Sequence, residues 1–197
     1  TPDLIYLGIG NGIAGGIFWR GELVRGASGS SGEFGHVTVL PDGPLCICGN
    51  RGCLQTLASG AAMVSEARKL IQAGRPSRLA ERAGGELSGE DVCRAAAEGD
   101  AVALECLARA VQYLAIAVAN LIAEYNPSAV VLGGPVGEIA EPLIPMLRAE
   151  VKRRAMAHPL SAVRIVPASL GRDAGAIGAA SLVLDRKFDL VFPDYRA

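Results

Sequence analysis

The chain contains the segment Cys46-Ile47-Cys48-Gly49-Asn50-Arg51-Gly52-Cys53, which holds three of its five cysteines. His36 precedes this segment closely in the sequence. A structural zinc ion takes four ligands in a tetrahedron, and three thiolates with one imidazole are a common set. Gly49 and Gly52 allow the chain to turn tightly around an ion. The predicted ligands of one closed, structural zinc site are His36, Cys46, Cys48 and Cys53.

A disulfide framework is the competing interpretation of these cysteines. The total of five is odd, two cysteines lie outside the segment, and no signal peptide is recognisable. We therefore expect reduced thiols and a cytoplasmic protein. Four residues without a shared role are the other alternative.

Composition restricts the class of protein. Half of the 197 residues are hydrophobic, so the chain can form one large domain or two small ones with a substantial core. The net charge of −1 and the sequence pI of about 6.1 exclude a generally basic surface for nucleic acid. The very apolar run Leu114–Ala123 is too short to span a membrane. Few aromatic residues and many alanines and glycines suit an α/β fold.

The beginning of the chain predicts short antiparallel strands. The predicted strands cover Leu4–Gly8, Gly15–Trp19 and Glu22–Arg25. Arg20-Gly21 is placed to form a hairpin turn, and a weak alternation over His36–Leu40 predicts a further strand. Thr1-Pro2-Asp3 leads directly into the first strand, so we expect a chain cut from a longer protein.

The remainder predicts helices with two buried strands between them. Ser59, the pair Ser88 and Asp91, and Asp100 are placed as N-caps, and Pro127 prevents extension of the long helix. The predicted helices run from Ser59 to Gln72, Glu90 to Glu98, Asp100 to Tyr125, Ile139 to Arg154 and Asp173 to Leu184. The predicted strands are Ala129–Leu132 and Val163–Pro167. This order indicates a layered α/β fold.

Two glycine-rich turns are candidate binding sites. Gly10-Asn11-Gly12 lies between strands, where glycines let a phosphate or sugar approach the backbone; a tight hairpin that needs positive φ is the competing explanation. The turn leads into a strand, so it is neither a Rossmann fingerprint nor a P-loop. Gly133-Gly134 joins a buried strand to a helix, which suits anion binding but equally an ordinary strand-to-helix turn.

A carboxylate and an imidazole lie close together before the cysteines. Glu33 and His36 are three residues apart, so a turn or short helix would place them on one face. Glu33 can accept hydrogen bonds from two vicinal hydroxyls, while His36 can bind zinc through one ring nitrogen and direct the other N–H at a ligand. In the alternative interpretation, Glu33 is only solvated and His36 is only a metal ligand.

These motifs resemble the ROK family (repressors, open reading frames, kinases). Gly32-Glu33-Phe34-Gly35-His36 and the cysteine segment are similar to the family signature in order and spacing, and Val131-Leu132-Gly133-Gly134 and Leu170–Ala180 resemble its later motifs. The resemblance covers nearly the whole chain. It implies an α/β protein of the actin/hexokinase-like (ribonuclease H-like) ATPase fold, mainly its C-terminal lobe. Residues 1–197 would form one sugar-binding effector domain with a zinc loop at 36–53.

The resemblance also implies a sugar site in the cleft between two lobes. Family members usually carry a second sugar-binding glutamate two residues after the last cysteine, where this chain has a glutamine. A glutamine still forms hydrogen bonds but lacks the charge, so sugar identity or affinity should differ. The expected sugar contacts are Glu33, His36 and Gln55.

The glycine turn separates two branches of the family. In ROK kinases it resembles Gly-Thr-Gly-Ile-Gly-Gly-Gly, and an Asp-x-Gly-x-Thr motif and a catalytic aspartate lie upstream. Here Asn11 replaces the threonine and Ala14 a glycine, and Asn11-Gly12 is similar to the repressor branch. We interpret the chain as the sugar-sensing effector domain of a ROK-type transcriptional regulator, without catalytic residues. The helix-turn-helix of such regulators is not in this sequence.

The runner-up is the C-terminal lobe of an ATP-dependent ROK sugar kinase of the glucokinase or N-acetylhexosamine kinase type. Its phosphate or nucleotide contacts would be Gly10, Asn11, Gly12, Gly133 and Gly134. A zinc-stabilised assembly module is a third alternative, in which Glu33 has no role.

The expected partners follow from the resemblance. They are a small sugar or sugar phosphate, a second copy in a homodimer or homotetramer, and DNA only through a domain outside this chain; no membrane is expected. The predicted long helix is apolar on more than one face, so it must be buried in the core or at an interface. The residues that show this are Val111, Leu114, Val118 and Leu121.

Overall fold

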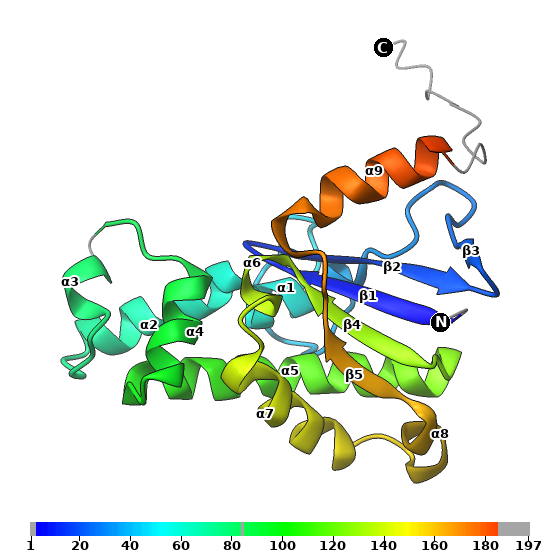
Figure 1. Ribbon diagram of the computed structural model, residues 1–197. Helices are drawn as coiled ribbons and strands as arrows, with labels where there is room; N and C mark the ends of the chain where they lie inside the picture. Colours follow the sequence, from blue (N-terminus) through cyan, green and yellow to red (C-terminus); the bar gives the residue numbers. More distant parts are fainter. Residues whose placement is uncertain (1–2, 84, 185–197) are drawn as a thin grey trace.

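A computed structural model of the protein describes residues 3–83 and 85–184 (Figure 1). Its centre is a five-stranded mixed sheet with the order β3-β2-β1-β4-β5. The strands are β1 (Leu4–Ile9), β2 (Ile13–Trp19), β3 (Glu22–Leu23), β4 (Ala129–Gly133) and β5 (Arg164–Pro167). β1 pairs antiparallel with β2 and parallel with β4, and β4 pairs parallel with β5. β1 therefore joins an antiparallel hairpin to a parallel half-sheet.

The N-terminal strands form as the sequence predicts. Ile5, Leu7 and Ile9 alternate along β1 and are fully buried, which fixes one face of the strand on the core. Arg20 and Gly21 both have positive φ, at 52° and 81°, as a two-residue type I′ hairpin requires. β3 is shorter than predicted and ends at Leu23.

The helices lie mostly on one side of this sheet (Figure 1). The long ones are α2 (Gly60–Gln72), α4 (Gly89–Ala97), α5 (Ala101–Tyr125), α7 (Ala140–Lys152) and α9 (Ala174–Leu184). The short ones are η1 (Phe34–His36), α1 (Leu54–Ala58), α3 (Ala80–Ala83), α6 (Gly134–Gly137), α8 (Ala157–Ala162) and η2 (Gly171–Asp173).

The predicted caps are confirmed. The Ser59 hydroxyl accepts from the amide of Ala62 at 3.2 Å, and Ser88 and Asp91 form a complete capping box at the start of α4. The Asp100 carboxylate accepts from the amide of Ala103 at 2.9 Å and so begins α5. These side chains satisfy amides that the first helical turn leaves without partners.

α5 is the central core helix. Val111, Leu114 and Val118 are at most 1% exposed, and α5 packs against α1, α2, α4 and α7. Of the helices in 3–83 and 85–184, it alone has the length and apolarity to cross a membrane, but 61% of that window is buried inside the protein. Its apolar faces are used within one chain, so the prediction of self-association now rests on the resemblance alone.

Two predicted elements differ from the structure. His36–Leu40 was expected as a strand, but η1 ends at His36 and only an isolated bridge joins Thr38 to Cys53. The segment instead forms one side of the cysteine loop, because its backbone partners come from the loop itself. The helix expected from Ile139 is preceded by α6, which begins directly after β4 at Gly134.

The second face of the sheet is more open. α9 lies on the side of the sheet away from α5 and α7 (Figure 1). Its sequence AGAIGAASLVL is apolar, yet none of its side chains is buried; Ile177 is 42% and Leu184 is 80% exposed. Tyr6 and Gly8 point to this open face, opposite to the buried residues of β1.

Candidate metal centre and sugar site

The structure brings the four predicted metal ligands together. Nδ1 of His36 lies 3.5 Å from Sγ of Cys46, and Sγ of Cys48 lies 3.6 Å from Sγ of Cys53. The four potential ligand atoms all lie within 4.8 Å of one another. Cys46 and Cys53 are buried, His36 is half-buried and Cys48 is exposed. One imidazole and three thiols therefore surround a single point.

This arrangement fits a zinc ion. Zn–S bonds of about 2.3 Å and Zn–N bonds of about 2.0 Å imply ligand–ligand edges of roughly 3.5 to 3.8 Å in a tetrahedron. The two short separations match these edges, and the donor set of three sulfurs and one imidazole is one that zinc prefers. Such a set leaves no coordination position for water, so it suits a structural role.

The backbone of the loop holds the ligands in place. The amide of Cys46 donates to the carbonyl of Asn50 at 2.7 Å, and the amide of Gly52 donates to Pro44 at 2.8 Å. Gly52 has a φ of 64°, and a Cβ there would overlap the carbonyl of Leu40. Glycine is therefore required where the loop folds back, just before Cys53.

The thiols have strongly different proton affinities. A hydrogen bond from the backbone of Cys48, assisted by the side chain of Gln55, lowers the pKa of Cys46 to about 6. Desolvation, together with the neighbouring thiols, raises the pKa of Cys53 to about 12. Three adjacent thiolates repel one another, so a divalent cation is needed to hold all three ionised.

Gly32 and Gly35 allow Glu33 and His36 to lie close beside β2. A Cβ on Gly32 would overlap the carbonyl of Gly15, and one on Gly35 would overlap the carbonyl of Ile13. The amide of Gly15 donates to the carbonyl of Gly32 at 2.9 Å. The two glycines therefore let η1 lie directly on β2. This packing places Glu33 and His36 beside the strand.

Glu33 and His36 face each other there. Oε2 of Glu33 lies 3.9 Å from Nε2 of His36, while the Nδ1 of the same ring faces Cys46. The Glu33 side chain is 62% exposed and that of His36 is 31% exposed. The ring thus directs one nitrogen at the cysteines and the other at the Glu33 carboxylate, a geometry that would allow His36 to serve both predicted sites.

Gln55, the third predicted sugar contact, is half-buried. Its Nε2 donates to Sγ of Cys46 at 3.3 Å. Its Oε1 lies beside the backbone of Gly12 and Gly35, where a Cβ would come within 3.3 Å and 3.1 Å. The sequence did not predict the contact with the thiol, and only its position two residues after Cys53 gave a signal.

The turn Gly10-Asn11-Gly12 packs against the N-terminal ends of α2 and α4. The amide of Gly60, at the first turn of α2, donates to the carbonyl of Gly10 at 2.7 Å. A Cβ on Gly60 would come within 2.9 Å of that carbonyl, and one on Gly89 within 2.5 Å of the Gly60 Cα. The first turns of α2 and α4 therefore meet at glycines beside Gly10-Asn11-Gly12, which the sequence analysis did not predict.

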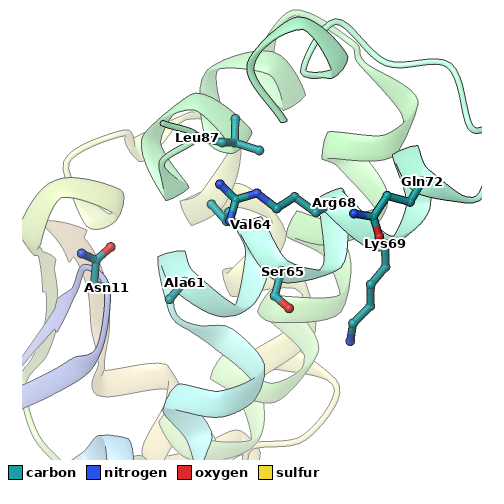
Figure 2. Close-up of a pocket in the computed structure, with 8 residues that line it drawn as sticks. All are labelled: Asn11, Ala61, Val64, Ser65, Arg68, Lys69, Gln72 and Leu87. Carbon is teal, nitrogen blue, oxygen red and sulfur yellow. The ribbon is translucent and has the colours of Figure 1, made fainter. Parts of the chain in front are cut away.

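A cavity of about 540 Å³ opens between this turn and α2 (Figure 2). Its lining residues are Asn11, Ala61, Val64, Ser65, Arg68, Lys69, Gln72 and Leu87. Figure 2 shows that Arg68 extends past Val64 toward Leu87, whereas Lys69 points away. Arg68 donates to the carbonyl of Gly85 at 2.8 Å, so the two cations do not converge.

The second glycine turn is filled by Tyr6. A Cβ on Gly133 would overlap both the ring and the hydroxyl of Tyr6. Burial and the charge of Glu138 raise the pKa of this hydroxyl, so it stays neutral. Glu90, Glu138 and Pro135 line the adjoining cavity of about 450 Å³. No local sequence pattern signals this contact.

The mixed sheet and the histidine–cysteine cluster together indicate the class of protein. Mixed-sheet α/β proteins of the actin/hexokinase kind include a ROK family glucokinase from Streptomyces griseus, solved with glucose and AMPPNP. That structure matches with a TM-score of 0.79 and 32% identity, over 92% of this chain and 60% of that one. The ROK family model matches residues 1–186. The chain belongs to the ROK family.

Its relatives have two kinds of function. A glucokinase from Halalkalibacterium halodurans is 34% identical over 186 residues, which cover 93% of this chain and 56% of the relative. A xylose repressor from Bacillus subtilis is 33% identical over 189 residues, which cover 96% of this chain and 46% of the relative. The chain thus spans about half the length of these relatives, and both regulators and kinases are similar to it.

Proposed function

We propose that this chain is the sugar-sensing effector domain of a ROK-type transcriptional regulator, with one structural zinc ion. The observation that favours a regulator over a kinase is which side chains occupy the two glycine turns. Tyr6 fills the turn at Gly133-Gly134, and Asn11 stands in the other turn. Both turns would have to bind phosphate in a kinase.

The turn at Gly134 is a poor phosphate cradle. Phosphate binding at such a turn needs free backbone N–H groups. The Tyr6 hydroxyl lies against Gly133 at this turn, and Pro135 has no N–H to offer. Glu90 and Glu138 line the same cavity and would repel a triphosphate. These features support a protein that does not use ATP at this turn.

Zinc would be held by the cluster already described. His36, Cys46, Cys48 and Cys53 are its proposed ligands. When bound, the ion supplies structural cross-linking and compensates the charge of the thiolates. It would also fix the ring of His36, so that Nε2 stays directed at Glu33. Loop rigidity and the sugar site would then depend on the same four residues.

The sugar would bind at the edge formed by Glu33 and His36. The exposed carboxylate of Glu33 can accept hydrogen bonds from two neighbouring hydroxyls, and Nε2–H of His36 can donate to a third oxygen. Gln55 is the third proposed contact. The S. griseus relative, solved with glucose, supports a sugar as the ligand class.

The rest of the proposal concerns the whole protein. Residues 1–197 would form one effector domain, the C-terminal lobe, in a cytoplasmic homodimer or homotetramer. DNA would be bound by a domain outside this chain. The cysteines of the described residues are free thiols, which suits a reducing compartment.

A kinase lobe is the second candidate function. The glucokinase relative from H. halodurans and the S. griseus structure with AMPPNP support it. In that case Gly10, Asn11, Gly12, Gly133 and Gly134 would contact the nucleotide, and Tyr6 would have to move from Gly134.

Calorimetry on the full-length protein separates the two functions. A panel of pentoses, hexoses and N-acetylhexosamines is titrated with and without AMPPNP, and a coupled assay follows ADP formation from ATP. We expect one sugar to bind with no heat from AMPPNP and no ADP above background. AMPPNP binding together with sugar-dependent ADP formation would establish the kinase instead.

A further inference from the structure

The turn Gly10-Asn11-Gly12 places an asparagine directly before a glycine on an exposed part of the chain. Asn11 and Gly12 are both exposed, and Asn11 lines the cavity of about 540 Å³ beside α2 (Figure 2). A glycine after an asparagine has no Cβ, so its amide nitrogen can approach the asparagine side chain with little steric hindrance. An asparagine in this setting is chemically labile in water.

The amide of Gly12 is also available for reaction. Within the described residues, the turn is closed by a hydrogen bond from the amide of Gly10 to the carbonyl of Gly12 at 2.9 Å, and the Gly12 amide itself has no backbone acceptor. Asp42-Gly43 is the contrasting case, because Gly43 is buried and its amide donates to the carbonyl of Leu40 at 2.9 Å. An amide that donates such a bond is held in place and is harder to deprotonate, so it is a weaker nucleophile.

The three other asparagines of the chain are exposed as well, but the residue after each of them hinders the same reaction. Asn126 is followed by a proline, which has no N–H. Asn120 lies inside α5, where the amide of the next residue is held in the hydrogen-bond ladder of the helix. Asn50 is followed by an arginine, whose side chain restricts the approach of the amide. Exposure therefore does not distinguish Asn11 from the others, but its successor does.

We propose that Asn11 is a site of spontaneous covalent modification, at which the asparagine converts to aspartate and isoaspartate. The amide nitrogen of Gly12 attacks Cγ of Asn11 and loses its proton, which passes to the side-chain nitrogen. The bond from Cγ to that nitrogen breaks, ammonia leaves and a succinimide ring remains. Water then opens the ring, at the Cγ carbonyl to give aspartate or at the backbone carbonyl to give isoaspartate. Water is the one co-reactant, and neither zinc nor sugar takes part.

The modification would change the turn in two ways. Both products add a negative charge, which would repel an anionic ligand from the turn. In isoaspartate the main chain also passes through the former side chain and is one carbon longer. The carbonyl of the neighbouring Gly10 accepts from the amide of Gly60 at 2.7 Å, and these two residues are in close contact. A longer main chain should therefore displace Gly10 and break this contact with the first turn of α2.

The test follows the full-length protein during incubation at mildly alkaline pH, by peptide mass spectrometry with a fragmentation method that separates isoaspartate from aspartate. Asn11→Gln, whose longer side chain would have to form a larger ring, and Gly12→Ala are compared with Asn50→Gln, the matched control at another exposed asparagine. Alanine is tolerated at position 12, because the φ of Gly12 is not left-handed and the atom nearest to a Cβ is Oε1 of the flexible Gln55 side chain, at 3.3 Å. Thermal unfolding checks that each variant folds.

We expect Asn11 to be the first asparagine of the wild type to convert. Asn11→Gln should abolish conversion in this segment and Gly12→Ala should slow it, whereas Asn50→Gln should convert at Asn11 as the wild type does. Hydrogen exchange of the isoaspartate form should show lost protection of the Gly60 amide and unchanged protection in the middle of α5. The proposal would be overturned if Asn11 stayed intact in the folded protein while urea-denatured protein converted there, or if another asparagine converted first. Conversion to isoaspartate that leaves the Gly60 amide protected would contradict the predicted effect on the turn.

Discussion

At the scale of single residues, the four candidate metal ligands reach the cluster from three parts of one short loop. His36 comes from the end of η1, Cys46 and Cys48 from the tight turn, and Cys53 from the start of α1. The sequence predicts this cluster because one histidine and three cysteines lie close together in the chain and match a common set of zinc ligands. It does not predict which neighbours support them, since Gln55 contacts Cys46 only once the loop has folded.

Cys48→Ser tests the proposed zinc site, because Cys48 is its exposed candidate ligand. A serine hydroxyl is a poor zinc ligand at neutral pH, so zinc affinity should fall on the order of 100-fold or more. Metal analysis of protein purified without chelator should give about one zinc per chain for the wild type and much less for the variant. Cys93→Ala is the matched control, because Cys93 is buried in α4 away from the cluster. A Cys48→Ser protein with full zinc content would contradict the assignment.

Glu33→Ala tests the sugar edge. Hydrogen bonds to a charged group contribute roughly 1.5 to 3 kcal/mol each, so loss of the carboxylate should weaken sugar binding at least about tenfold. Zinc content and folding should remain, because Glu33 is not a predicted ligand and its side chain is mostly exposed. Calorimetry on the full-length protein measures the change.

Glu22→Ala removes an exposed carboxylate from β3 and is the control for charge. If Glu33→Ala bound sugar with wild-type affinity, Glu33 would not be the main sugar contact and the sensor proposal would be contradicted. The zinc-stabilised assembly module would then be the better interpretation.

At the scale of helices and strands, polar N-cap residues determine where the core helices begin. Asp100 accepts from the amides of Ala103 and Arg78 at 2.9 Å and 2.7 Å, and from the Ser77 hydroxyl at 3.0 Å. Desolvation raises the pKa of this carboxyl, but the hydrogen bonds outweigh it, and the pKa is lowered. The ionised form is thus the one that stabilises the start of α5.

Asp100→Ala should lower the free energy of unfolding by about 2 kcal/mol at neutral pH, from a lost cap and lost charge-assisted hydrogen bonds. Because the folded-state pKa lies below the unfolded value, this stabilisation is present above about pH 4 and is lost as the pH falls through the folded pKa. Urea denaturation at pH 7 and pH 3 should show the difference shrink. Glu124→Ala, an exposed change in α5, should stay within about 0.5 kcal/mol.

The sequence predicts most elements for a physical reason. The apolar run of β1, the capping box of α4 and Pro127 after the long helix are local signals, and the structure has a strand, a capped helix and a helix end at these places. His36–Leu40 failed as a strand because its hydrogen-bond partners lie in the metal loop, which alternation does not report. The contact of Tyr6 with Gly133 joins β1 to the end of β4, and no local pattern can show it.

At the scale of the whole molecule, the cysteine loop contacts the apolar core mainly at its two ends, through Val39 and Leu54. The apolar core extends from β1 and Leu54 through α2, α4, α5 and α7, and the cysteines of the cluster are not part of it. The loop instead is held by its own backbone hydrogen bonds, to which the proposed zinc would add. Units with so little shared packing can open independently.

Removal of zinc should therefore disorder Pro41–Cys53 and leave the sheet and α5 folded. In hydrogen-exchange measurements on the full-length protein, chelation should abolish protection of the amides of Cys46 and Gly52, which bond only within the loop. Amides in the buried middle of α5 should keep theirs, because their protection depends on the core. Readdition of zinc should restore the loop. Loss of protection throughout α5 after chelation would instead mean that the metal supports the whole domain, as it does in small zinc-dependent folds.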